Sequence, residues 1–394
     1  MSKTILFVDD EKQILRALKR LFIRSEYETF YAESGEMALE ILEENKVDLV
    51  ITDIRMPLMD GYQLLRTVKE KYPLTLRVAL SGYTDNIKIY KALEDNIVKL
   101  YLFKPWNNDE LKDVIDKIFE QEEILQDKNL LKLINNINDL PTVPDLYGQI
   151  SKLIENGADI DEISKVIEKD PAISSRILRV ANSAFYGTKT GSVKQAIIYI
   201  GLTSVKNIVL TNSVFKELKS DQVEKELLWK HVSLTNAYAN LIYSEFINKK
   251  MPSTFASAGL LHDIGKVVIY QHFKEKKEAV LKMVQENQGI STWEAEKEII
   301  GVSHQEIGGY LLNWWELPFP IVEAALFHHN PMAENIINKE LVSVIHLANY
   351  YSWKTLDSKL FRNALKEEVF TYLKVDRAEF EAFIAEYNKN LKWE

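Results

Sequence analysis

The first 120 residues contain a set of polar side chains of the types needed to transfer a phosphoryl group. Each closely follows a short, apolar, β-branched run; they are Asp9, Asp10, Asp53, Ser81 and Lys104. Crowded carboxylates raise each other's pKa unless a cation lies among them, and oxygen ligands of this kind suit Mg²⁺. With a lysine and a hydroxyl nearby, such a site can place a phosphoryl group on Asp53.

The apolar runs alternate with amphipathic segments, five times over. The expected strands are 4–8, 28–32, 48–52, 76–80 and 99–103. This alternation predicts an α/β fold, a doubly wound five-stranded parallel sheet with helices on both faces. Its strands share one carboxyl edge, so we expect the polar residues to meet there. Simpler interpretations exist for single residues: Asp10 with Gln13 would form a capping box, Asp53 would cap a turn, and Lys104 would be a surface charge.

Residues 1–120 resemble the receiver domain of two-component response regulators. The motifs FVDDEKQ, VITDIRMPLMDGYQLL, LSGYTD and LYLFKPW occur in the family's order. The resemblance implies a flavodoxin-like sheet, Asp53 as phospho-acceptor, and a sensor histidine kinase or phosphotransfer protein as donor. It implies that Mg²⁺ is held by Asp9, Asp10, Asp53 and the backbone carbonyl of Arg55. It further implies phosphoryl-contact or switch roles for Ser81, Tyr101 and Lys104, and a cis Lys104–Pro105 bond.

Two bulky residues lie close to the implied phosphorylation site. Arg55 and Tyr83 come two positions after Asp53 and Ser81. We expect both side chains to hinder an attacking water molecule, and so to lengthen the lifetime of the phosphorylated state.

A charged helical segment follows the last expected strand. Residues 107–139 read as one long helix or as two helices that abut, and 121–139 form the expected linker. Apolar residues at heptad-like spacing permit a coiled-coil homodimer, but a solvated linker helix fits equally well; they are Leu111, Ile115, Ile118 and Leu125. The prolines of LPTVP, 140–144, interrupt helix formation, and we place the domain boundary there.

All seven histidines lie between His231 and His346, in a region that reads as almost entirely helical. Candidate metal ligands among them, with one aspartate, are His231, His262, Asp263, His304, His328 and His329. Imidazole and carboxylate groups suit Mn, Fe, Ni or Zn, and water on such a metal could attack a phosphodiester. Equally, these side chains could hydrogen-bond one another and join helices in a core.

Residues 138–350 resemble an HDOD domain, an all-α module related to HD-type phosphohydrolases and generally regarded as non-catalytic. The motifs include LPTVPDLYGQI, DPAISSRILRVANSAFYG, AGLLHDIGKVV and VIHLANYY. We assign 140–350 to this domain and 351–394 to C-terminal helices packed on it. Asp170, Ser192 and Thr203 are expected to cap its helices.

The resemblance also indicates what a catalytic HD site would need. Its pattern is a His, a His-Asp pair and a distal Asp, which here fall on His231, His262, Asp263 and Asn349. An amide in the fourth place weakens a divalent metal site. The Gly-Tyr-Pro element of cyclic-dinucleotide phosphodiesterases is missing after the double His, and Lys266 either binds a phosphate or reaches solvent. We therefore expect a vestigial site, with a second metal disfavoured; the alternative is a receiver-gated metal-dependent phosphohydrolase.

Composition restricts the partners. The 394 residues carry a net charge of −9, with a pI near 5.5, which argues against a nucleic-acid partner. The chain has no cysteine, no signal-peptide pattern, and no apolar run near the ~18 residues that span a bilayer. The sequence predicts a cytoplasmic protein without membrane contact. Its downstream partner is expected to be a protein, with a nucleotide as the alternative.

Overall fold

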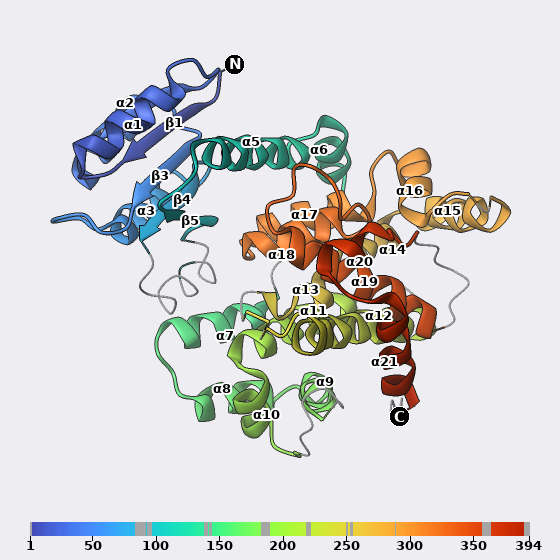
Figure 1. The fold of residues 1–394 in the computed structure, drawn as a ribbon. Helices are drawn as coiled ribbons and strands as arrows, with labels where there is room; N and C mark the ends of the chain where they lie inside the picture. Colours follow the sequence, from blue (N-terminus) through green and yellow to red (C-terminus); the bar gives the residue numbers. More distant parts are fainter. Residues whose placement is uncertain are drawn as a thin grey trace. The chain divides into compact units, whose positions relative to one another are not determined.

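The computed structural model describes most of the chain in two compact units (Figure 1). The described residues are 2–82, 92, 97–137, 141, 144–182, 190–217, 222–249, 251–252, 255–287, 289–356 and 364–389. The first unit comprises Met1–Phe119 with Glu316–Phe319, and the second comprises Glu120–Trp315 with Pro320–Glu394. Helix α5, Asn108–Leu125, therefore contributes residues to both units.

The first unit is built on a parallel sheet of five strands in the order β2-β1-β3-β4-β5, which confirms the predicted fold class. The strands are β1 (Thr4–Val8), β2 (Glu28–Ala32), β3 (Leu49–Asp53), β4 (Leu76–Gly82) and β5 (Leu100–Lys104). Each predicted strand lies within two residues of the observed one. The central strands are apolar because both faces are covered by helices, which include α1 (Lys12–Phe22), α2 (Gly35–Glu44) and α3 (Gly61–Lys71).

The first helix begins later than a capping box at Asp10 would require. Its N-cap is Glu11, without a side-chain hydrogen bond, and Asp10 is exposed. The capping interpretation of Asp10 is therefore wrong. Asp53 does accept a hydrogen bond from the backbone N–H of Arg55, at 2.6 Å, as a turn-forming aspartate would.

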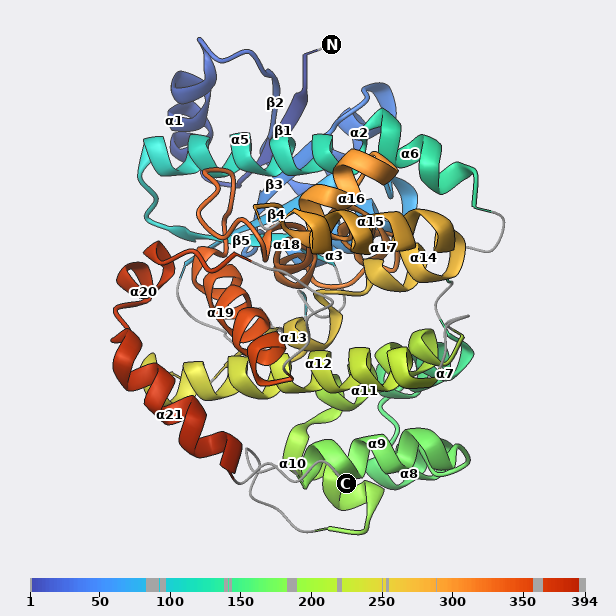
Figure 2. The same cartoon turned by 90° about the vertical axis from the view of Figure 1, so that its right-hand side faces the viewer.

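The regular elements of the second unit, among the residues that the structure describes, are all helices (Figure 2). Its helices before the first histidine are α6 (Lys128–Asn135), α7 (Asp145–Glu155), α8 (Ile160–Ile167), α9 (Pro171–Ala181), α10 (Val193–Ile200) and α11 (Leu202–Glu217). Those that follow are α12 (Gln222–Leu241), η1 (Ile242–Phe246), α13 (Ala258–Leu261), α14 (Gly265–His272), α15 (Lys274–Glu286), α16 (Thr292–Ile300), α17 (His304–Trp314), α18 (Phe319–Phe327), α19 (Lys339–Thr355), α20 (Glu368–Leu373) and α21 (Arg377–Lys389).

Helix boundaries match the sequence signals at two of three predicted caps. Asp170 caps α9 ahead of Pro171, and Ser192 caps α10. Thr203 lies inside the first turn of α11, because that helix already begins at Leu202, so this cap was wrong. The described part of 107–139 forms two helices, α5 and α6, which is the second of the two predicted alternatives.

The core of the second unit joins distant segments. Helices α12 and α19 pack along each other, and the C-terminal helices α20 and α21 contribute Phe370 and Phe380 to the same apolar cluster as Tyr238 and Tyr351. Among the described residues no single helix is long and apolar enough to cross a bilayer, although α10 and the following part of α11 pass that test as a pair bent by 113°.

Candidate functional sites

The first candidate site lies at the carboxyl edge of the sheet, where one lysine joins two aspartates. Lys104, the last residue of β5, has its Nζ 2.7 Å from Oδ2 of Asp9 and also in an ion pair with Oδ1 of Asp53. β1 and β3 are neighbours, so the two aspartates end adjacent strands. The structure thus brings Asp9, Asp53 and Lys104 together, while Asp10 is exposed and lies outside this trio.

Burial and charge act against each other at this edge. Asp9 is fully buried, and burial raises its pKa although Lys104 and the backbone N–H of Glu11 favour the carboxylate. Burial works against the charge of Lys104, but hydrogen bonds to Asp53 and Asp9 leave its pKa above the ordinary value. The two carboxylates therefore depend on a neighbouring cation, which Lys104 supplies and Mg²⁺ would reinforce.

The loop after Asp53 is held against helix α3. Asp60 caps α3 in a capping box with Gln63. A Cβ at Gly61 would lie 2.1 Å from the carbonyl oxygen of Asp53, so only glycine allows the helix to begin this close to the strand end. The motif that the sequence showed as MDG is thus a packing requirement of the site.

The structure describes some of the other predicted residues of this edge and not others. Tyr101 is buried in the apolar cluster of the unit, and burial raises its pKa. The Lys104–Pro105 bond is cis, as the resemblance implied. The side chain of Ser81 and all of Tyr83 lie outside the described residues.

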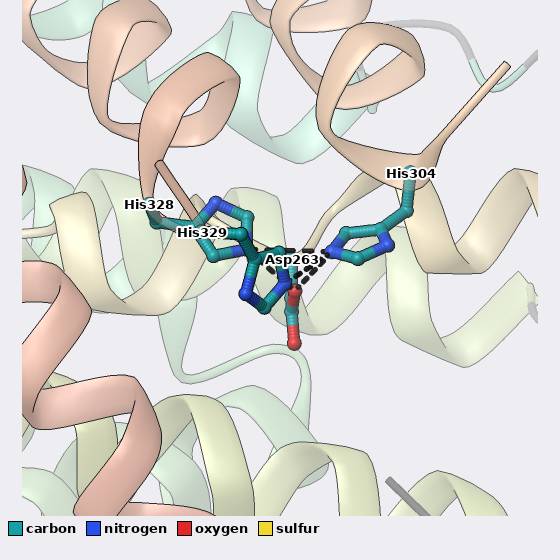
Figure 3. Close-up of side chains that lie close together, drawn as sticks. All are labelled: Asp263, His304, His328 and His329. Atoms are coloured by element: carbon teal, nitrogen blue, oxygen red, sulfur yellow. Dashed lines mark hydrogen bonds and ion pairs between the residues drawn. The ribbon is translucent and has the colours of Figure 1, made fainter. Parts of the chain in front are cut away.

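The second candidate site is a buried cluster of histidines around Asp263 (Figure 3). Its members come from separate places in the chain: His231 from α12, His262 and Asp263 from the α13–α14 junction, His304 from the start of α17, His328 and His329 from the end of α18, and Asn349 from α19. All seven are at most 3% exposed. The predicted residues thus converge on one point.

Asp263 divides the cluster into two ligand sets. Its Oδ2 lies 3.1 Å from Nε2 of His231 and 3.5 Å from Nε2 of His262. Its Oδ1 lies 3.3 Å from Nε2 of His304 and 3.4 Å from Nε2 of His328. Oδ1 is buried without a partner in hydrogen-bond geometry among the described residues. Two groups of atoms therefore share one carboxylate, as a bridging aspartate would between two metal ions.

Contacts outside the cluster determine which ring nitrogens face inward. Nδ1 of His262 and of His328 each face a backbone carbonyl at 2.9 Å, from Gly259 and Ala325. A carbonyl can only accept, so these Nδ1 atoms carry the hydrogen and the inward Nε2 atoms are lone-pair donors when the rings are neutral. This is the tautomer that binds a metal.

The Nδ1 atoms of His304 and His231 also have partners outside the cluster. Nδ1 of His304 lies 2.5 Å from Oε2 of Glu296, and Nδ1 of His231 lies 2.6 Å from the hydroxyl oxygen of Ser352. That hydroxyl donates to the carbonyl of His231, so its oxygen accepts from the ring. Sequence reasoning missed Glu296 and Ser352, since neither is adjacent to a histidine in the chain.

The charges of the cluster are uneven. Burial lowers the pKa of His231 and of His262 to about 3 and that of His328 to about 4. Burial would raise the pKa of Asp263, but Lys266 and the imidazoles hold it well below its ordinary value. His304 is the exception: burial opposes its charged form, yet Glu296 raises its pKa.

Two domain families match this chain, in separate parts of the sequence. The response regulator receiver domain family matches residues 5–116, and the HDOD domain family matches residues 140–331. The chain carries a receiver domain followed by an HDOD domain. The HDOD part resembles the crystal structure of an HDOD domain protein of unknown function from Geobacter sulfurreducens, with 25% identity and a TM-score of 0.54, over 68% of this chain and 97% of that one.

Curated relatives match in parts only. An uncharacterized protein of Treponema pallidum is 26% identical over 55% of this chain and 43% of its own length. The hydrogenase transcriptional regulatory protein HoxA of Cupriavidus necator is 32% identical over 33% of this chain and 27% of its own length. The chain spans less than half the length of these relatives. The chain therefore has the architecture in which a receiver domain regulates an output domain.

Lys266 of the HDOD domain is buried, which corrects the expectation that it could reach solvent. It is 1% exposed, and its Nζ lies 2.5 Å from Oδ2 of Asp263 and 5.3 Å from the ring centre of Trp353. Trp353 also stacks on His231, with ring centres 3.8 Å apart. A cation and an aromatic wall therefore close the His231 side of the cluster.

Proposed function

We propose that this protein is a phosphorylation switch in which the receiver domain accepts a phosphoryl group on Asp53 and thereby controls binding of a protein partner by the HDOD domain. The observation that carries the proposal is the pairing of Lys104 with both Asp9 and Asp53 at the carboxyl edge of the sheet. A receiver domain implies a phosphodonor, and we take it to be a sensor histidine kinase or a phosphotransfer protein.

The chemistry follows from the residues of that edge. An oxygen of Asp53 attacks phosphorus, the bond between phosphorus and the donor's nitrogen breaks, and an acyl phosphate forms. Mg²⁺ held by Asp9, Asp10, Asp53 and the Arg55 carbonyl would neutralise charge on the transferring group. Lys104 then exchanges part of its pairing with Asp53 for the new phosphoryl oxygens, because these carry more charge than the carboxylate.

The HDOD domain is proposed to be a non-catalytic output module. Every cluster residue is buried, so a phosphodiester has no direct approach to Asp263. Asn349 offers Nε2 of His262 an amide oxygen at 3.4 Å where the hydrolases have a carboxylate. Lys266 and a protonated His304 can neutralise Asp263 from both sides without a metal, which suits a structural role.

One observation favours a second candidate function, metal-dependent phosphodiester hydrolysis. The inward Nε2 atoms of two neutral histidines, His231 and His262, face each other at 3.3 Å. Lone pairs this close repel unless a cation or a shared proton lies between them. The donor set fits a transition metal, which would activate water as a nucleophile; the shared Oδ1 and Oδ2 of Asp263 would hold two such ions.

The test of the switch uses the full chain with Mg²⁺ and acetyl phosphate. We expect one phosphate that base and hydroxylamine remove, seen as a shifted band in phosphate-affinity electrophoresis, which Asp53→Asn abolishes. Asp113→Asn is the matched control, because Asp113 is an exposed residue of α5. Labelling that persists in Asp53→Asn would contradict the assignment. A pull-down with beryllofluoride-treated protein against Asp53→Ala then tests the output, and equal capture by both would contradict the switch.

The test of the second candidate is metal content together with turnover. Protein purified with Mn²⁺ or Fe²⁺ is assayed for bound metal and against a set of cyclic dinucleotides. Turnover that is lost in His262→Ala and Asp263→Ala would replace the non-catalytic proposal. Bound metal without turnover would support a structural metal centre.

A further inference from the structure

A polar cavity of about 690 Å³ lies in the helical unit, and none of its lining residues belongs to the His/Asp cluster. Helix α6 supplies Asn129, Lys132 and Asn136 to its wall, and the junction of α14 with α15 supplies His272, Phe273 and Lys276. The proposed switch uses none of these residues. The cavity has the volume of a site for a small organic ligand.

The lining of this cavity is basic, although the chain as a whole is acidic. No aspartate or glutamate is among the described residues that line it, while the chain carries a net charge of −9. Neither Lys132 nor Lys276 forms an ion pair with any residue that the structure describes. Two ammonium groups at one cavity favour an anionic ligand, because they lack a carboxylate to neutralise them.

The cavity also offers an aromatic surface and hydrogen-bonding amides. Lys276 Nζ lies 5.8 Å from the ring centre of Phe273. Phe273 precedes α15, a 13-residue helix whose N-cap has no side-chain hydrogen bond, so the positive end of that helix adds to the field of the lysines. The amides of Asn129 and Asn136 can both donate and accept, as the edge of a nucleobase requires.

We propose that this cavity binds a nucleotide, with its phosphate on Lys132 and Lys276 and its base on Phe273. Phosphate alone would use only the two lysines, and an uncharged aromatic molecule would leave them unpaired. A nucleotide has the negative charge for the two lysines, an aromatic base for Phe273 and a size that suits the cavity. This goes beyond the proposed switch, because it gives the helical unit a small-molecule input at α6, the helix that follows α5.

The experiment measures binding to the full chain by isothermal titration calorimetry. The probes are AMP, GMP, ADP and GDP, with adenosine, guanosine and inorganic phosphate as comparison arms. We expect at least one nucleotide to bind about tenfold more tightly than both its nucleoside and inorganic phosphate. Lys132→Gln with Lys276→Gln should weaken it about tenfold or more, and Phe273→Leu should weaken the nucleotide but not inorganic phosphate.

The control variant is Lys128→Gln with Lys282→Gln, which removes the same charge from α6 and α15 outside the cavity lining. It should bind as the wild type does, and circular dichroism verifies that each variant is folded. Absence of binding by every nucleotide at millimolar concentration overturns the proposal. Equal loss in the control and cavity variants, or equal affinity for phosphate and nucleotide, does so as well. His262→Ala should retain binding, which separates this site from the cluster.

Discussion

The ammonium group of Lys266 lies 2.5 Å from Oδ2 of Asp263, and both side chains are buried in the helical core. In a low-dielectric surrounding, each charge would be costly without the other. Lys266 is thus the fixed cation of the histidine cluster. The pair also occupies the oxygen that His231 and His262 face, so a metal bound there would have to share Asp263 with it.

Removal of this cation should destabilise the HDOD domain. Lys266→Met keeps an unbranched side chain as far as the ε position but removes the ammonium group, which leaves Asp263 without its closest partner. We expect the unfolding free energy to fall by about 3–5 kcal/mol in the presence of a chelator, measured by urea denaturation. Lys282→Met is the control, since Lys282 is exposed and 3.8 Å from Glu286. Unchanged stability of Lys266→Met would show that the ion pair does not hold the cluster.

Addition of a metal ion to Lys266→Met tests whether the cluster binds a divalent ion. If the cluster accepts a divalent ion, Zn²⁺ or Mn²⁺ should restore part of the lost stability, because an ion that binds only the folded state stabilises it. Restoration should fail when His304→Ala is added, as this removes one ligand of the Oδ1 side. A metal-independent loss would favour the purely structural cluster.

The lifetime of the phosphorylated receiver is predicted to depend on Arg55 and Tyr83. Arg55 is exposed beside Asp53, to which its backbone N–H donates. Alanine at both positions should open a path for water and speed dephosphorylation severalfold, followed by loss of label after the donor is removed. Arg66→Ala, an exposed change on α3, should leave the rate unaltered. An equal rate in the double variant would contradict the shielding role.

The receiver edge was predictable because its placement rule is local. Each strand is a short apolar run, and residues after parallel strands must meet at one edge, so the pairing of Lys104 with Asp9 and Asp53 follows once the strands are recognised. Asp10 was harder, since it follows Asp9 by one position and neighbouring side chains of an extended chain point in opposite directions. Its exposure is the consequence.

The histidine cluster could be listed from the sequence but not assembled from it. Helical periodicity identifies buried faces, yet it does not say which faces of α12, α14, α17, α18 and α19 meet. The outer partners Glu296 and Ser352 read as ordinary helix residues, because only tertiary packing brings them to His304 and His231. Lys266 likewise had two interpretations until its burial was known.

Glycine at 265 is predicted to be required for the cluster. A Cβ there would lie 2.0 Å from the carbonyl oxygen of His304 and 2.7 Å from the backbone nitrogen of Gly308, and neither backbone can yield easily. Gly265→Ala should therefore push α14 from α17 and cost about 1–3 kcal/mol or more of unfolding free energy. Gly148→Ala is the matched control, because nothing lies within 4 Å of its Cβ position in α7, and it should stabilise by about 0.5–1 kcal/mol. Thermal denaturation of both variants measures the difference.

A buried carboxylate on α18 should make the stability of the HDOD domain depend on pH. Glu323 is fully buried and accepts hydrogen bonds from the side chains of Gln121 and Asn338 and from two backbone N–H groups. Burial outweighs these donors and raises its pKa above the ordinary 4.5. Between 4.5 and the raised pKa, the folded protein holds a proton that the unfolded chain has lost.

The unfolding free energy should therefore fall as pH rises through that window, and this slope should disappear in Glu323→Gln. As pH rises from 4.5, the wild type should lose unfolding free energy relative to Glu323→Gln. Urea denaturation at a series of pH values measures both proteins. Glu298→Gln, an exposed change on α16, controls for the substitution because it leaves the buried network intact. A wild-type advantage that grows with pH would mean that the four donors, and not burial, dominate at Glu323.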